Sequence, residues 1–243
     1  MTTPRFLLVS PRTGEEIAAA ERGDFLRATG LAESDLDQVV IDSTDAVVGS
    51  LDGYVGIFVG GSPLNITTDS PSAYQEHVHA QLAPLVGGPL PAFFVCFGAG
   101  FVTDLLGGHV GRTHPEAAGP TTVELTASGR RDVLLRDLPH EFPALTGHTE
   151  NIVIPALECE VLATAPSCPT QMVRYGDHTW ACQFHADMDP QAMKTRMDFY
   201  RDYGYFNAKD YDDIVATLPE VDTRAANQIL ANFVRFCADY QPR

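Results

Sequence analysis

The chain has 243 residues, of which 44% are hydrophobic, and this is enough to bury a sizeable core in one large α/β domain. Its 32 acidic and 16 basic residues give a formal net charge of −16. Because contacts to phosphates need clustered lysines and arginines, this balance argues against a nucleic-acid partner.

The N-terminal stretch MTTPRFLLVSPRTGEE contains a single apolar run, Phe6 to Val9, which is too short for a signal peptide or a membrane span. The five cysteines are scattered and form no CxxC pair, so they indicate neither a disulfide framework nor a structural zinc site. We therefore expect a cytoplasmic protein in a reducing compartment, with no membrane partner.

Apolar runs alternate with amphipathic segments through the first hundred residues. The pattern predicts strands at 6–10, 38–43, 54–61 and 91–96, with helices near 14–29 and 73–86. This alternation is typical of a doubly wound parallel sheet with both faces covered. Ligands bind such sheets beyond the carboxyl ends of the strands, which is where Gly60, Gly61 and Cys96 fall.

The rhythm changes after residue 108, where apolar runs become shorter and are separated by glycine, proline and charge. The runs HVGR, TTVELTA, DVLLRDL and NIVIPA suit an antiparallel edge or a β-insertion, and three further strands are predicted at 159–165, 170–176 and 178–185. From about residue 190 to 243 the pattern is helical, with an apolar stripe from Ala226 to Cys237. We expect one domain over residues 1–243.

Cys96 lies between the predicted strand AFFV and a predicted helix that contains Gly98 and Gly100. A strand-to-helix turn of this kind can expose a nucleophile, and small neighbouring residues keep the backbones from colliding. The amides that begin the helix, with the positive end of its dipole, favour a thiolate and can bind an oxyanion. The alternative is an inert buried cysteine, which is common in protein cores.

The segment HTWACQFHADMD supplies a base and an acid. Strand alternation places His185 at the carboxyl end of the last strand, with Asp187 two residues later on the same side. A thiol needs such a base, and the base needs a third group to fix its tautomer. Two alternatives remain open. The first is a strand-end histidine that is paired with a nearby acid for solubility. The second is a metal site made of His148, His178, His185 and Asp187, although no tight ligand motif is present.

Four motifs together resemble the class I glutamine amidotransferases. They are the oxyanion turn GGSP (60–63), the nucleophile elbow VCFGAG (95–100), the pocket segment HTENI (148–152) and the histidine motif QFHAD (183–187), in the order of that family. The resemblance implies a three-layer α/β/α fold with a mostly parallel, doubly wound, flavodoxin-like sheet and a C-terminal helical extension at about 190–243. It implies no cofactor and no metal.

The resemblance also assigns roles. Cys96 would attack a carboxamide, His185 would shuttle the proton and Asp187 would orient His185. The oxyanion would be held by the amides of Phe97 and of the turn at Gly61 and Ser62. The substrate would be a small amide contacted by Gly60, Gly100, His148 and Glu150.

The sequence departs from the family at four positions. Gly100 stands where the family has a glutamine, and Phe94 where it has a glycine. Asp187 replaces a glutamate, and Glu150 replaces an aspartate. Glutamine specificity is therefore in doubt, because a site that hydrogen-bonds its substrate discriminates strongly only when its partners are present.

Two classes of function remain. The first is a Cys-His-Asp amidotransferase or hydrolase that acts on glutamine or on another γ-glutamyl or small amide. The second is a binding or regulatory module that kept the fold and lost turnover. No synthetase domain follows the amidotransferase-like region in this sequence, so ammonia would pass to a synthetase partner subunit, or the protein would be a stand-alone hydrolase.

Overall fold

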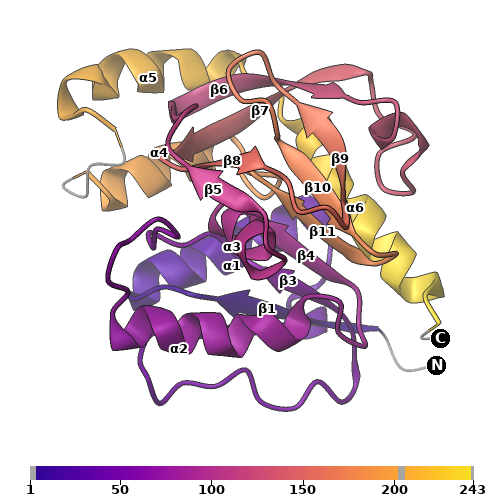
Figure 1. Cartoon of the computed structure of the whole chain (residues 1–243). Helices are drawn as coiled ribbons and strands as arrows, with labels where there is room; N and C mark the ends of the chain where they lie inside the picture. The colour runs from indigo at the N-terminus through magenta and orange to yellow at the C-terminus, as the bar shows by residue number, and fades with distance from the viewer. Residues whose placement is uncertain (1–3, 202–205, 242–243) are drawn as a thin grey trace.

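The secondary structure begins with the strand and helix alternation that the sequence predicts. A computed structural model describes residues 4–201 and 206–241 (Figure 1). Its first elements are β1 (Arg5–Ser10), α1 (Glu15–Thr29), β2 (Leu36–Val40), β3 (Tyr54–Val59), α2 (Ala73–Leu82), β4 (Ala92–Val95) and α3 (Phe97–Leu105). These elements confirm the predicted segments, although β2 begins and ends earlier than expected and α2 is followed by the 3-10 turn Ala83–Leu85.

The second half of the chain supplies short strands and then helices. The strands are β5 (His109–Gly111), β6 (Glu116–Leu125), β7 (Glu141–His148), β8 (Asn151–Ile154), β9 (Cys159–Thr164), β10 (Met172–Tyr175) and β11 (Thr179–Cys182). The helices are α4 (Pro190–Phe199), α5 (Tyr211–Thr217) and α6 (Arg224–Asp239). The predicted helical extension is therefore present in the described residues.

Nine of the described strands form one mixed sheet in the order β2-β1-β3-β4-β11-β10-β9-β6-β7. Neighbours from β2 to β11 run parallel, and neighbours from β11 to β7 run antiparallel. The first four strands follow the flavodoxin-like order, which places the ends of β1, β3, β4 and β11 at one edge. Strands β5 and β8 form a separate antiparallel pair.

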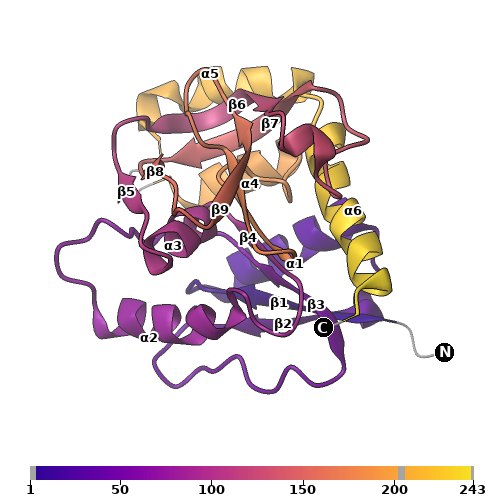
Figure 2. The same ribbon diagram turned by 45° about the vertical axis from the view of Figure 1, so that its right-hand side comes forward.

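Helices cover both faces of the sheet and make the predicted three layers. On one face Phe58 contacts the rings of Phe25 from α1 and Phe233 from α6. The opposite face buries Leu7 and Val9 with side chains from α2 and α3. Figures 1 and 2 show α2 near the parallel strands, whereas α5 lies over β6 and β7 at the far end of the molecule.

One local prediction was wrong, and one strand was missed. The segment DVLLRDL (132–138) is a series of turns and not a strand, because the buried Asp132 carboxylate accepts hydrogen bonds from the backbone N–H of Leu134 at 2.9 Å and from Trp180 Nε1 at 3.2 Å. Strand β7 was not predicted, and it contains Pro143, which an edge strand tolerates because one side of it needs no ladder hydrogen bond.

The helices of the fold are short or amphipathic. Within residues 4–201 and 206–241, no helix combines the length and the apolar composition needed to cross a bilayer. The short N-terminal apolar run forms β1 of the sheet.

Candidate active site

Cys96 occupies a strained turn between β4 and α3. Its backbone has φ 53° and ψ −101°, and it is the one non-glycine residue with positive φ in the described part of the chain. Its N–H donates to the Cys182 carbonyl at 2.7 Å. A non-glycine residue held in this region costs free energy, and such strain clusters at functional sites. The backbone thus turns sharply from strand to helix at Cys96, as the sequence predicts.

Gly98 provides the space that this strand-to-helix turn requires. An ideal Cβ on Gly98 would lie 2.6 Å from the Cβ of Phe94, so any larger residue would collide with the strand. Position 94 can therefore hold a phenylalanine where the family has a glycine, because Gly98 on the helix leaves the room for it. The Phe94 ring borders the same contact, with Cδ1 3.2 Å and Cγ 3.3 Å from the ideal Cβ, and it stacks on Phe101 with ring centroids 6.5 Å apart.

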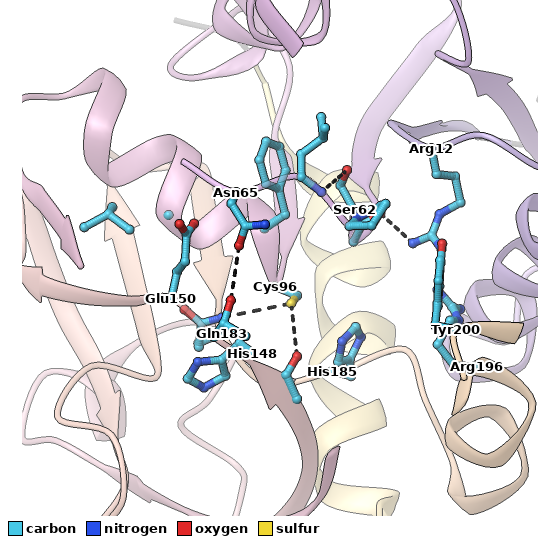
Figure 3. A pocket seen from close by; sticks show the side chains of 18 residues that line it. Arg12, Ser62, Asn65, Cys96, His148, Glu150, Gln183, His185, Arg196 and Tyr200 are labelled. Carbon is cyan, nitrogen blue, oxygen red and sulfur yellow. Dashed lines mark hydrogen bonds between the residues drawn. The ribbon is translucent and has the colours of Figure 1, made fainter. Parts of the chain in front are cut away.

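The Cys96 side chain is only 9% exposed, and it lies in a cavity of about 150 Å³. Its sulfur lies 3.9 Å from the Gly147 carbonyl oxygen and 4.0 Å from Gln183 Nε2 (Figure 3). The same cavity is lined by His185, Gly61 and Ser62. A cavity of this size suits a small ligand.

His185 and Asp187 follow β11, and His185 lines the same cavity as Cys96. The His185 N–H donates to the Leu145 carbonyl at 2.8 Å, which fixes the backbone after the strand ends. Nδ1 of His185 donates to Oδ1 of Asp187 at 3.1 Å, and the two side chains are 3% and 1% exposed. The base and the acid that the sequence predicts are therefore in contact.

The environment of His185 favours its protonated form. Burial alone would lower the pKa of His185, but the Asp187 charge, the hydrogen bond to Asp187 and hydrogen bonding with Cys96 together raise it to about 9. Burial raises the pKa of Asp187, and the His185 and Arg196 charges outweigh burial and hold that pKa below its usual value. The pair can therefore present an imidazolium to the sulfur at neutral pH.

Burial disfavours a thiolate at the other four cysteines. Burial raises the pKa of Cys159 and of Cys168 to about 11. Burial also raises the pKa of Cys182 and of Cys237 well above the usual value. Reactivity at these positions is disfavoured because the thiolate is the reactive form.

The turn Gly60-Gly61-Ser62-Pro63 follows β3 and borders the cavity. An ideal Cβ on Gly61 would lie 3.4 Å from His185 Cε1 and 3.7 Å from Cys96 Cβ, which places this turn directly beside both side chains. Gly60, the first residue of the turn, packs against Glu21, where a Cβ would approach Glu21 Oε1 to 2.4 Å. It does not line the cavity, in contrast to the substrate contact expected from the sequence. Phe97, at the first position of α3, also lines it.

Known proteins resemble this chain in sequence and in fold. No family model matches the chain. It is 28% identical over 146 residues to the glutamine-hydrolyzing GMP synthase of Aeropyrum pernix. The match covers 60% of this chain and 27% of the relative. It is 24% identical over 154 residues to one subunit of the glutamine-hydrolyzing GMP synthase of Sulfolobus acidocaldarius. This match covers 62% of this chain and 77% of the relative.

A crystal structure of a glutamine amidotransferase from Thermotoga maritima has the same fold, with a TM-score of 0.76 and 16% identity over 98% of this chain and 100% of that one. The chain is therefore similar in sequence to glutamine-hydrolyzing GMP synthases and in fold to a glutamine amidotransferase. The match to the Aeropyrum relative covers about a quarter of that protein's length.

This amidotransferase-like chain has an apolar wall at the position of the family glutamine. Gly100 lines the cavity, and an ideal Cβ on it would lie 3.3 Å from Ile66 Cγ1 and 3.7 Å from Val110 Cγ1. These two side chains occupy the space that a longer residue at position 100 would need. The missing glutamine is therefore replaced by packing and not by another polar group at that position.

His148 lines the cavity, but its ring is bound from behind. Glu116 accepts from His148 Nε2 at 2.7 Å and from Gln171 Nε2 at 2.6 Å. Burial raises the pKa of Glu116, but hydrogen bonds from His148, Ser167 and Thr121 outweigh burial and lower it to about 2. Nε2 of His148 therefore carries the proton that an ionised Glu116 accepts.

Glu150 also lines the cavity, and its carboxylate is engaged with the loop after the oxyanion turn. It accepts from the N–H of Ile66 at 2.6 Å and the N–H of Thr67 at 2.9 Å, and from the Thr67 hydroxyl. Arg112 lies 3.6 Å from it. Glu150 therefore holds this loop, and the substrate contact expected from the sequence stays a prediction.

The histidines of the alternative metal site lie apart. His178 precedes β11 and binds the Gly88 carbonyl at 2.8 Å, whereas His185 lies beyond the other end of that strand. Among the described residues, a group of three potential ligand atoms occurs instead at Glu116, His148 and Cys168. That group contains the His148–Glu116 hydrogen bond already described.

Sequence reasoning missed several polar residues that line the cavity, including Arg12, Arg196 and Tyr200. Arg12 lies two residues beyond the end of β1, so its position near the carboxyl end of a central strand was a usable signal. Arg196 and Tyr200 belong to α4 and its C-cap, and their approach depends on how that helix packs. No local motif marks them.

Proposed function

We propose that the chain is an amide hydrolase of the amidotransferase type, with Cys96 as nucleophile, His185 as acid and base, and Asp187 as the group that orients His185. The observation that carries this proposal is the strained Cys96 turn facing the buried His185–Asp187 pair in one small cavity. A structural cysteine needs neither the positive φ nor the paired histidine. The proposal treats the chain as one working domain.

The chemistry follows from the positions of these groups. The Cys96 sulfur attacks the carbonyl carbon of the amide, and the π electrons of the carbonyl move onto its oxygen. The N–H groups of Phe97 and Ser62 are proposed to hold that oxyanion. Loss of one such donor typically costs about 100- to 1000-fold in rate.

The intermediate then collapses, and the carbon–nitrogen bond breaks as His185 gives its proton to the leaving ammonia. A water molecule attacks the resulting thioester while His185 removes its proton, and the Cys96 thiolate leaves with the carboxylic acid product released. The raised pKa of His185, to about 9, keeps a proton available for the leaving group at neutral pH.

The substrate is proposed to be glutamine or another γ-glutamyl or small amide. A cavity of about 150 Å³ accommodates a small molecule and not a folded chain. The apolar contacts around Gly100 from Ile66 and Val110 favour a substrate whose nearby portion needs no hydrogen bond. Glutamine itself is therefore expected to react more slowly than an amide that carries an apolar group there.

A synthetase partner is proposed because the Sulfolobus relative is named as one subunit of a glutamine-hydrolyzing GMP synthase. Ammonia formed by this chain would then pass to a separate synthetase. The second candidate is a binding or regulatory module without turnover, and the filled space beside Gly100 is the observation that favours it.

Ammonia release tests the proposed function. The natural chain and Cys96→Ala are incubated with glutamine and a panel of γ-glutamyl and simple carboxamides, and ammonia is measured with a coupled dehydrogenase. We expect release from at least one amide by the natural chain and none by the variant. Equal background release by both proteins across the panel would contradict the proposed hydrolysis and leave the binding module.

A further inference from the structure

Arg12 lies behind the oxyanion turn, in the loop that connects β1 to α1. Its side chain is 2% exposed. The guanidinium donates to three acceptors from three parts of the chain: the Gly61 carbonyl oxygen, Glu21 Oε1 at 2.6 Å, and the Tyr200 hydroxyl at 3.1 Å. The planar fork of arginine suits such divergent acceptors better than a single ammonium does.

The bond to Gly61 determines the direction of one peptide plane. The described residues contain no cis peptide bond, so the Ser62 N–H points opposite to the Gly61 carbonyl. Figure 3 shows the turn between Arg12 and Cys96. Because Arg12 holds the carbonyl on one side, the Ser62 N–H is directed toward the other side, where Cys96 lies. A reversed peptide would place an acceptor beside the developing oxyanion.

Buried charges around Arg12 keep it in place. Glu21 is fully buried, and its Oε1 lies 2.6 Å from Arg12 Nη2 and 3.7 Å from Arg196 Nη1. The Glu21 carboxylate also occupies the space beside Gly60, where a Cβ would approach it to 2.4 Å. The glycine at position 60 is thus explained by this ion pair beneath the turn. Removing one member of a buried pair leaves an uncompensated charge, so the pair acts as a unit.

We propose that Arg12 is a positioning residue that fixes the Gly61–Ser62 peptide so that its amide faces the oxyanion, an inference that rests on the proposed function. Arg12 touches no reacting atom in this role. Its loss would slow acyl transfer at Cys96 without changing the reactivity of the sulfur toward a reagent that forms no oxyanion.

Two reagents separate these effects. p-Nitrophenyl acetate acylates a thiolate through a tetrahedral oxyanion and needs no amide pocket, whereas iodoacetamide alkylates the sulfur by direct displacement of iodide. The test compares the natural chain with Arg12→Lys, which keeps a positive charge beside Glu21. Arg22→Lys is the matched control, because Arg22 also donates to a backbone carbonyl, that of Leu36, but does not line the cavity.

We expect Arg12→Lys to lower the acylation rate by about 10- to 1000-fold, where the upper limit corresponds to the complete loss of one oxyanion donor. The alkylation rate of Cys96 is expected to change less than about twofold. Arg22→Lys is expected to change neither rate. If Arg12→Lys does not fold, the double variant Arg12→Gln with Glu21→Gln removes both buried charges together and is expected to show the same divergence of the two rates.

Three results would overturn the inference. Acylation could stay at the natural rate in a folded Arg12 variant, or acylation and alkylation could fall together. The natural chain could also alkylate at Cys96 yet show no acylation, which would mean that no working oxyanion site exists for Arg12 to position. Rapid acylation of the natural chain without ammonia release from any amide would contradict the proposed function alone.

Discussion

Replacing Asp187 with asparagine is expected to change the protonation of His185 more than the shape of the site. Asparagine has nearly the same size and keeps an acceptor oxygen for His185 Nδ1, which lies 3.1 Å from Oδ1 of Asp187. It removes the charge that opposes the effect of burial on the pKa of His185. His185 is therefore expected to lose its proton at neutral pH in the variant.

The sign and size of the effect on stability follow from the pKa of His185. A folded-state pKa of about 9, above the ordinary value of 6.5, means that the proton on His185 stabilises the native state. This contribution is fully present below pH 6.5 and is lost as the pH rises through about 9. At ~1.4 kcal/mol per pKa unit, the full contribution is about 3 kcal/mol.

Urea unfolding at several pH values between 6 and 9 measures this contribution. We expect the difference in free energy of unfolding between the natural chain and Asp187→Asn to narrow with rising pH, by up to about 3 kcal/mol. Asp222→Asn, which removes an exposed aspartate, is the control and should give a constant difference over the same range. Parallel profiles for the natural chain and Asp187→Asn would refute the reasoning about His185.

Three further predictions concern the supports of the site. Glu116→Gln should make the free energy of unfolding fall less steeply in acid. The ionised Glu116 stabilises the fold above pH 4.5, and this stabilisation is lost as the pH falls toward 2. Urea unfolding between pH 5 and 3 measures the difference. Gly98→Ala should lower the free energy of unfolding by about 1–3 kcal/mol through collision with Phe94, measured by thermal melting; an unchanged melting temperature would contradict the close approach. Gly100→Gln should hydrolyse glutamine faster only when Ile66→Ala is also present, because Ile66 occupies the required space; equal ammonia release by the single and double variants would contradict this.

Much of the fold could be predicted because the parallel half relies on local patterns. The strands β1, β3 and β4 are continuous apolar runs, and their neighbours along the chain are amphipathic helices. The antiparallel half was harder to predict. Asp132 ends the expected strand at DVLLRDL through hydrogen bonds that include a donor from Trp180, 48 residues away. Pro143 concealed β7, because its tolerance depends on β7 being at the edge of the sheet.

The candidate site divides in the same way. Cys96, His185 and Asp187 were predicted because short motifs carry them, and the two members of the acid–base pair are two residues apart. The partners that fix these motifs are distant in sequence. Arg12 reaches Gly61 across 49 residues, and a single sequence gives no signal for such a pairing.

The expected contact residues show the limit most clearly. Both His148 and Glu150 line the cavity, as the resemblance implied. The sequence could not show that His148 is bound from behind by Glu116 or that Glu150 holds the backbone at Ile66. These pairings arise only when β6, β7 and the loop after β3 come together.

The most direct test of the central claim is reaction with a diazo-ketone analogue of glutamine, followed by intact-mass measurement and peptide mapping. An activated thiolate beside a working amide pocket predicts one adduct per chain, located on Cys96, and no adduct on Cys96→Ala. Brief iodoacetamide labelling of the same preparations reports which thiol is reactive. An adduct on another cysteine, or Cys96 reacting no faster with iodoacetamide than the other four, would contradict the assignment of Cys96 as the nucleophile.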